Sequence, residues 1–143
     1  DVDGRQDLAC SLLLTSATSL AALSAELAGG ELDVRRFRPN LHVTFNDLAP
    51  YAETAFTGGV VRAGDAWARA LHPCVRCVIP TRDPDTTEKD PLILRHLARE
   101  HETLFGINLA PLGAGTIRVG DPVAVGVTVL GLSAVSNICL PRR

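Results

Sequence analysis

Two cysteines three positions apart, Cys74 and Cys77, occur in the stretch HPCVRCVIPTRDPDT at residues 72–86. A pair at this spacing can supply half of a four-ligand zinc site or act as a redox dithiol. It can also pack as two small apolar side chains, which is the simplest interpretation of a pair that stands alone.

The two chemical interpretations each lack a second feature. A zinc site would need two further ligands, and Cys10, Cys139 and His72 show no ligand spacing. A thioredoxin-like dithiol normally lies where a strand leads into a helix, whereas the following VIPT is typical of a strand interrupted by Pro80. His42, His96 and His101 are scattered as well, so surface or packing roles are expected for the histidines.

An arginine cluster, RRFRPN at residues 35–40, forms the second candidate site. A proline-locked loop before a strand can hold the planar fork of an arginine and the Asn40 amide toward an anion. Taken alone, the cluster is explained as well by a solvated loop of charges. Nearly all basic residues are arginine, with Lys89 as the single lysine, which suits bidentate recognition of phosphate or carboxylate.

Length and charge limit the function classes. The chain has 143 residues, enough for one domain with its own core, and a formal charge of -2. No general positive field is present, so nucleic acid is not an expected partner. Four cysteines are too few for a secreted disulfide framework, which favours a reducing compartment and a cytoplasmic location. Because the chain begins with Asp1, we expect it to be part of a longer protein.

Two apolar stretches are long enough to raise the question of a membrane or targeting segment. Residues 8–28 follow Asp1, Asp3 and Asp7 and contain hydroxyl side chains, which argues against a signal peptide. The apolar stretch beginning at Pro122 falls short of the roughly 20 residues needed to cross a bilayer. We therefore expect no membrane span and a buried strand pair near the C-terminus.

The hydrophobic pattern predicts the elements that position these residues. Strands are expected at 10–15, 41–46, 58–64 and 66–80, with a bulge at Pro73, and again in FGINLAPL, GTIRVGD and PVAVGVTVL. Helical spacing follows an N-cap among Ser16 to Ser19 and stops at Gly29–Gly30, and a second helix at 92–102 carries Leu94, Leu97 and Ala98 on one face. DPDTTEKDP at 83–91 reads as an exposed turn. The predicted fold is mainly β with two short helices (α+β), a curled and largely antiparallel sheet or β-barrel.

Five segments taken in order, LLLTSATSL, RRFRPNL, HPCVRCVIPTRDPDT, FGINL and GTIRVGDPV, resemble the MOSC domain, the C-terminal domain of molybdenum cofactor sulfurases. They are similar to stand-alone bacterial members and to the mitochondrial amidoxime-reducing component. The resemblance covers residues 10–125 and implies a single MOSC domain over 1–143. Most stand-alone members carry a β-rich domain before the MOSC domain. The resemblance therefore also implies that this sequence is a fragment of a longer chain and lacks that domain.

The resemblance implies a molybdenum cofactor (Mo-molybdopterin) site and its residues. Cys77 takes the position of the metal ligand and catalytic thiolate, whereas Cys74 has no ligand role and is expected to pack. The cofactor-binding residues implied by the motifs are Arg38, Asn40, Val75, Arg76 and Asn108, with Val75 and Arg76 acting largely through their backbone. Asp7 is a further candidate for the pocket wall.

The resemblance implies an oxidoreductase, or its cofactor-binding half, that reduces N-hydroxylated compounds. Electrons would come from a separate reductase or ferredoxin-like protein, because the sequence shows no flavin motif and no iron–sulfur cysteine pattern. The alternative is a module that carries the cofactor, or a sulfur atom on Cys77, for cofactor sulfuration or delivery. In sulfurases that role is linked to a pyridoxal phosphate domain, which this chain does not contain.

Overall fold

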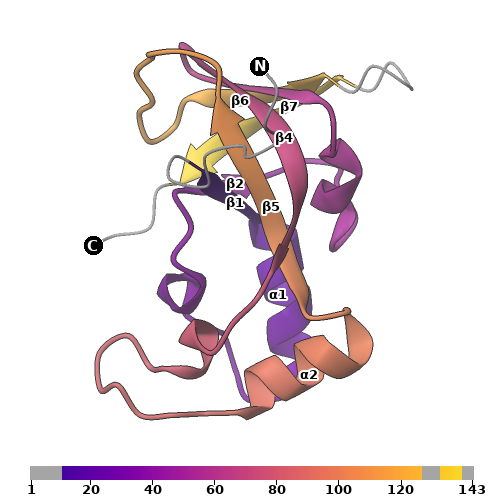
Figure 1. The fold of residues 1–143 in the computed structure, drawn as a ribbon, viewed down its shortest axis with the longest axis vertical. Coiled ribbons are helices and arrows are strands. Elements are labelled where there is room, and N and C mark those ends of the chain that lie inside the picture. Colours follow the sequence, from indigo (N-terminus) through magenta and orange to yellow (C-terminus); the bar gives the residue numbers. More distant parts are fainter. Residues whose placement is uncertain (1–10, 127–132, 140–143) are drawn as a thin grey trace, which may run out of the picture.

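The computed structural model describes residues 11–126 and 133–139, and Asp7 and Cys10 lie outside them. Seven described strands close into a barrel (Figure 1). Around the barrel they follow the order β1 (Leu12–Ser16), β2 (Leu41–Thr44), β7 (Ser133–Cys139), β6 (Pro122–Gly126), β3 (Val60–Ala63), β4 (Ala66–Val75) and β5 (Leu104–Pro111). The β1–β2 pair is parallel and the other six pairs are antiparallel. The predicted fold class, mainly β with two α-helices, is confirmed.

Apolar side chains on alternate strand positions fill the barrel, as the period of two along a strand requires. Leu14, Val43, Ile107 and Leu109 are fully buried in this core. The other buried members of the cluster are Leu41, Phe45, Phe56, Val61, Ala63, Ala68, Ala70, Val123 and Val125. This core fixes the register of the strands, because a slip by one residue would turn their apolar side chains outward.

The first helix, α1 (Ala17–Leu27), follows β1 directly and begins and ends as predicted. The Ser16 side chain caps it by accepting a hydrogen bond from the Ser19 backbone at 3.4 Å. Ala28, just before the glycine pair, takes the left-handed conformation that ends the helix. Leu20 and Leu23 are buried in a second core with residues of α2, β5 and a 3₁₀ helix.

The second helix, α2 (Leu92–Glu100), lies at the far end of the long β4–β5 pair from the barrel (Figure 1). Its buried residues are Ile93 and Leu97, so the prediction is confirmed for Leu97 and wrong for Leu94 and Ala98. Leu94 is half-buried and Ala98 is exposed, so the buried face is rotated from the expected one. Helical spacing allows both faces, and Ile93 is the residue that belongs to the second core with Phe37 and Phe105.

Three short 3₁₀ helices connect these elements: η2 (Val34–Phe37), η3 (Ala52–Phe56) and η4 (Ile79–Thr81). The predicted strand at GTIRVGD is wrong, because residues 115–121 form a loop. In that loop the Asp121 carboxylate accepts the Arg118 backbone N–H at 2.7 Å, which closes a turn and takes the place of a ladder bond. The expected C-terminal strand pair is confirmed as β6 and β7. No described helix is long and apolar enough to cross a membrane.

Candidate functional site

The two-cysteine motif lies where β4 leaves the sheet. Pro73 interrupts the pairing of β4 with β5, and the register shifts on both sides of it, as a missing ladder donor requires. Val75, the last residue of the strand, is 69% exposed. Cys74 is half-buried and Cys77 is exposed, and both thiols are free. The bulged strand therefore presents Cys77 to solvent while it keeps Cys74 partly covered.

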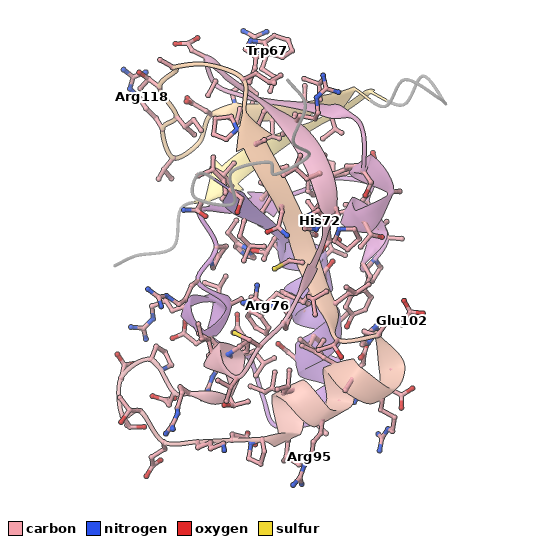
Figure 2. All side chains as sticks on the ribbon, in the orientation of Figure 1. Trp67, His72, Arg76, Arg95, Glu102 and Arg118 are labelled. Atoms are coloured by element: carbon pink, nitrogen blue, oxygen red, sulfur yellow. The ribbon has the colours of Figure 1, made fainter. Side chains whose placement is uncertain are left out.

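Arg76, between the cysteines, connects β4 to η2. Its Nη2 donates to the Phe37 carbonyl at 2.8 Å, and its Nη1 donates to the Cys74 sulfur at 3.3 Å. The guanidinium carbon also lies 5.6 Å from the centre of the Phe37 ring. The backbone N–H of Arg76 is bonded to the Thr103 carbonyl at 2.8 Å. Figure 2 labels Arg76 at this junction. The side chain thus has a positioning role that its motif position did not indicate.

Two arginines of the RRFRPN cluster are bound to the acidic turn that follows the cysteines. Arg35 contacts the Asp33 carboxylate at 2.6 Å and that of Asp85 at 2.7 Å, and Arg36 contacts Asp83 at 2.8 Å. The Arg35 hydrogen bonds lower the pKa of Asp33 despite its partial burial. These pairs hold η2 against the turn, so the interpretation of a merely solvated loop of charges is wrong for both arginines.

The acidic turn is itself ordered by Asp83. Its Oδ1 accepts the backbone N–H groups of Asp85 at 3.0 Å and Thr86 at 2.9 Å. The Thr86 and Asp85 backbone donors, together with the charge of Arg36, lower the pKa of Asp83. The predicted exposed turn is confirmed, and its acidic residues serve as counter-charges to η2.

Arg38 differs from its two neighbours in the cluster. It caps η2 in the left-handed conformation with φ of 52°, and its backbone N–H donates to the Arg35 carbonyl at 3.1 Å. Its side chain is exposed and makes no hydrogen bond or ion pair with any residue that the structure describes. Two residues later, the Asn40 Oδ1 accepts the Leu13 backbone N–H at 2.8 Å, and the Asn40 N–H donates to the Leu13 carbonyl at 2.9 Å. Asn40 therefore joins the loop to β1, with its amide N–H₂ unused in the described part of the chain.

Asn108 lies on β5 directly opposite Leu13, so both asparagines flank the same residue of β1. The Asn108 amide contacts the His72 ring at 3.3 Å across β4 and β5, and Figure 2 labels His72 on β4. Sequence reasoning missed His72, although a β4–β5 register around the Pro73 bulge would have placed it beside Asn108. Gly106, in the same FGIN segment, has a φ of 78° and lets β5 approach the Leu14 carbonyl closely.

The motifs contribute an exposed thiol at Cys77, a guanidinium at Arg38 that is unpaired among the described residues, and the side-chain amides of Asn40 and Asn108. The Arg76–Phe37 bond connects the residue before Cys77 to the residue before Arg38. A thiolate is a ligand for soft metals, while guanidinium and amide donors suit a phosphate or a heterocycle edge. The roles assigned by resemblance to Cys77, Arg38, Asn40, Val75 and Asn108 stay predictions, and the one for Asp7 lies outside the described residues.

Comparison with known proteins supports this assembly of motifs. The family model described as the MOSC domain matches residues 5–124. The human mitochondrial amidoxime-reducing component 1 is 32% identical over 124 residues, which cover 78% of this chain and 35% of that protein. Component 2 from human is 32% identical over 127 residues and that from Macaca fascicularis is 33% identical over 125 residues. The chain thus spans about a third of the length of these relatives, with 36% of each component 2 covered.

Proposed function

The chain belongs to the MOSC domain family, and we propose that it binds a molybdenum–pterin cofactor with the Cys77 thiolate as the protein ligand of the metal. One observation carries the proposal. Of the three arginines in the RRFRPN segment, Arg35 and Arg36 are neutralised by aspartates, and Arg38 alone has no partner in the described residues. An exposed cation held in a fixed left-handed conformation is suited to an anionic ligand.

The residues around Arg38 fit the rest of such a cofactor. Cys77 is exposed and unpaired, and its thiolate is a soft donor of the kind that molybdenum takes. The Asn40 amide is fixed by the Leu13 backbone and has its two N–H donors available for a pterin edge or a phosphate. Asn108 flanks Leu13 from the other side of β1, on β5. Val75 and Val78 are exposed apolar residues on either side of the cysteine, which a bound ligand would cover.

We propose that the chain is the cofactor-binding half of an oxidoreductase that reduces N-hydroxylated compounds. When bound, the cofactor supplies the two-electron redox chemistry. This chain contributes the thiolate, the Arg38 cation and the amides that orient the cofactor. The relatives are named as amidoxime-reducing components, and an electron-donor protein remains part of the proposal.

Neither the family match nor these relatives supports the alternative of a sulfur carrier or a link to pyridoxal phosphate. Both human relatives are named as mitochondrial proteins. The cytoplasmic location expected from the cysteine count stays a prediction for this chain.

Substitution of each cysteine tests the proposal. In Cys77→Ser the hydroxyl stays protonated at neutral pH, so molybdenum per chain should fall at least tenfold while the fold is unchanged. Cys74→Ser is the matched control, because Cys74 is assigned no ligand role; it should keep the metal and cost about 1 kcal/mol or less. Molybdenum is measured by elemental analysis, and reduction of an amidoxime is measured with an artificial electron donor. Equal loss of molybdenum in both variants would sink the single-ligand assignment.

A further inference from the structure

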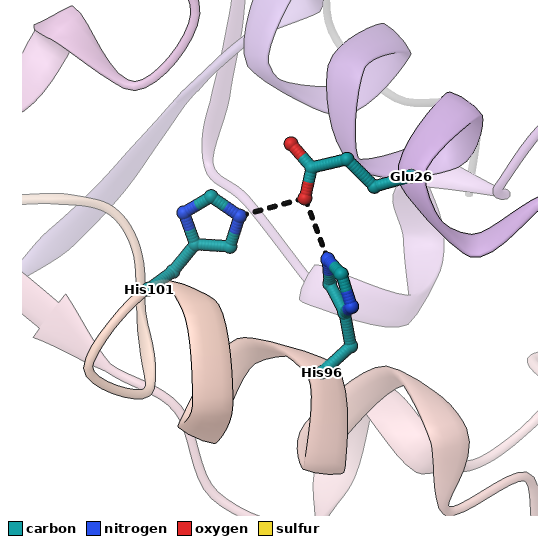
Figure 3. A group of neighbouring side chains, drawn as sticks. All are labelled: Glu26, His96 and His101. Atoms are coloured by element: carbon teal, nitrogen blue, oxygen red, sulfur yellow. Dashed lines mark hydrogen bonds and ion pairs between the residues drawn. The ribbon is translucent and has the colours of Figure 1, made fainter.

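A second group of metal-ligating side chains lies away from the cysteines, between α1 and α2 (Figure 3). Glu26 comes from the last turn of α1, His96 from α2, and His101 from the residue that caps α2. Their ligand atoms all lie within 4.8 Å of one another. The expectation that the histidines are scattered is therefore wrong for His96 and His101, because the fold of α2 against α1 brings them together.

The two rings point at one atom. The Nε2 atoms of His96 and His101 lie 2.6 Å and 2.7 Å from the same Glu26 oxygen, Oε2. Figure 3 draws both contacts converging on this oxygen. Two imidazole nitrogens and a carboxylate oxygen that converge in this way form the His₂Glu set that holds zinc in open, water-accepting sites.

Tyr51 completes the arrangement from a third element. Its hydroxyl donates to the other Glu26 oxygen, Oε1, at 2.8 Å, and its ring stacks on His101 with the centres 4.0 Å apart. Tyr51 thus orients both the carboxylate and one imidazole. Residues that surround metal ligands usually orient them in this way. The side chains of His96 and His101 are 14% and 19% exposed and that of Glu26 is 32% exposed, so the cluster keeps an opening to solvent.

We propose that Glu26, His96 and His101 bind a Zn²⁺ ion that joins α1 to α2, with water as the fourth ligand. In a tetrahedral site with bonds near 2.1 Å the ligand atoms stand roughly 3.4 Å apart, so each N–O separation needs to widen by about 0.8 Å. The exposed Glu26 side chain allows this by rotation. Each Nε2 then binds zinc through its lone pair, and the ring proton of each imidazole resides on Nδ1.

A neighbouring cleft shares His101 and Tyr51 with the proposed site. This cleft has a volume of about 260 Å³ and is lined by Tyr51, Glu53, Glu100, His101 and Leu104 among others. The proposed site is separate from Cys77 in the chain and in the fold, and its ligands do not depend on the function proposed for the cysteine motif.

The test is a Zn²⁺ titration of the whole chain without a histidine tag. A Cys74→Ser/Cys77→Ser background removes the two thiols of the cysteine motif as competitors for zinc, and Cys10 and Cys139 are kept alike in the parent and in every variant. Calorimetry should give one ion per chain. Saturating zinc at a hundred times the dissociation constant should raise the melting temperature by roughly 5–10 °C. Co²⁺ in place of zinc should give the strong visible absorption of a tetrahedral centre.

Near-isosteric variants keep the test independent of folding. Glu26→Gln and His96→Gln retain polar side chains of similar size and should each weaken zinc binding at least tenfold, and His101→Phe should do so while it keeps the stacking on Tyr51. Glu88→Gln and His72→Ala are the matched controls and should bind zinc like the parent. Absence of stoichiometric binding, or binding that survives loss of Glu26 and His96 together, would overturn the proposal.

Discussion

Arg76 donates from Nη2 to the carbonyl oxygen of Phe37 at 2.8 Å and thereby fixes the end of β4 to η2. Each partner of this bond immediately precedes a residue of the candidate site, Cys77 after Arg76 and Arg38 after Phe37. A charge-assisted bond to a backbone carbonyl is among the stronger hydrogen bonds in proteins. Together with the ion pairs of Arg35 and Arg36, this contact sets how the segment with Cys77 lies against the segment with Arg38.

Replacement of Arg76 by lysine tests this dependence. Lysine keeps the charge but cannot bond both the Phe37 carbonyl and the Cys74 sulfur through one planar fork. The free energy of unfolding, measured with urea, should fall by roughly 1–2 kcal/mol. Arg95→Lys is the control, since Arg95 is exposed on α2 and should change stability by less than about 0.5 kcal/mol. Equal effects of the two substitutions would contradict the positioning role of Arg76.

Arg38 is expected to affect ligand binding without affecting stability. Arg38→Lys retains the charge and removes the fork, so molybdenum content should fall several-fold while the urea midpoint stays within error of the parent. Arg36→Lys should show the opposite pattern, because Arg36 holds Asp83 in an ion pair with little exposure. A molybdenum content that is unchanged in Arg38→Lys would mean that this guanidinium is merely solvated.

The elements of the fold were largely predictable because local signals agree with the packing. The signals are local: a strand is indicated by alternating apolar residues, the start of α1 by Ser16, and the turn by Asp83, each over a few residues. The sequence does not decide between a curled open sheet and a closed barrel. Closure depends on pairing between β2 and β7, which lie far apart in the chain. The loop at 115–121 was missed because its apolar residues resemble a strand, while the turn is closed by the Asp121 carboxylate.

The site was predictable in its motifs and not in its contacts. The order of motifs pointed to Cys77, Arg38 and Asn40. The sequence does not show, however, that Arg35 and Arg36 pair with Asp85 and Asp83, which lie about fifty positions further along the chain. The convergence of His96 and His101 on Glu26 could not be read from spacing either, because it requires the packing of α2 against α1.

Glu53 should give the stability of the protein a measurable dependence on pH. The side chain is fully buried, its Oε2 accepts the Ser19 hydroxyl at 2.7 Å, and its Oε1 has no partner in the described residues. Burial raises the pKa of Glu53 above its ordinary value near 4.5. The contribution of this group is therefore fully present below pH 4.5 and is lost as the pH rises through the raised pKa.

Glu53→Gln should remove this loss, because the amide stays neutral at every pH. The measurement is the free energy of unfolding against pH for the parent, for Glu53→Gln and for the exposed control Glu88→Gln. The Glu53→Gln curve should rise relative to the parent above pH 4.5, whereas the control should run parallel to it.

Glu26 should affect stability in a different pH range. Burial opposes ionisation of Glu26, but hydrogen bonds from His101, His96 and Tyr51 lower its pKa to about 2. Its stabilisation is lost only as the pH falls below 4.5, so the two effects occupy separate windows.

Gly106 is expected to be the least replaceable residue of the FGIN segment. A Cβ atom at this position would lie 2.7 Å from the Leu14 carbonyl oxygen and 3.0 Å from a Thr15 methyl group, and the φ of 78° is already unfavourable for an L-residue. Gly30 offers a matched control, because its φ is 92° and nothing lies within 4 Å of its added Cβ. Gly30→Ala should therefore cost only conformational strain, about 1 kcal/mol, whereas Gly106→Ala should cost roughly 3 kcal/mol by urea unfolding. The same substitution should reduce molybdenum content, because a shift of β5 away from β1 moves Asn108 away from Leu13. Equal costs at the two glycines would show that the approach of β5 to β1 is not limiting.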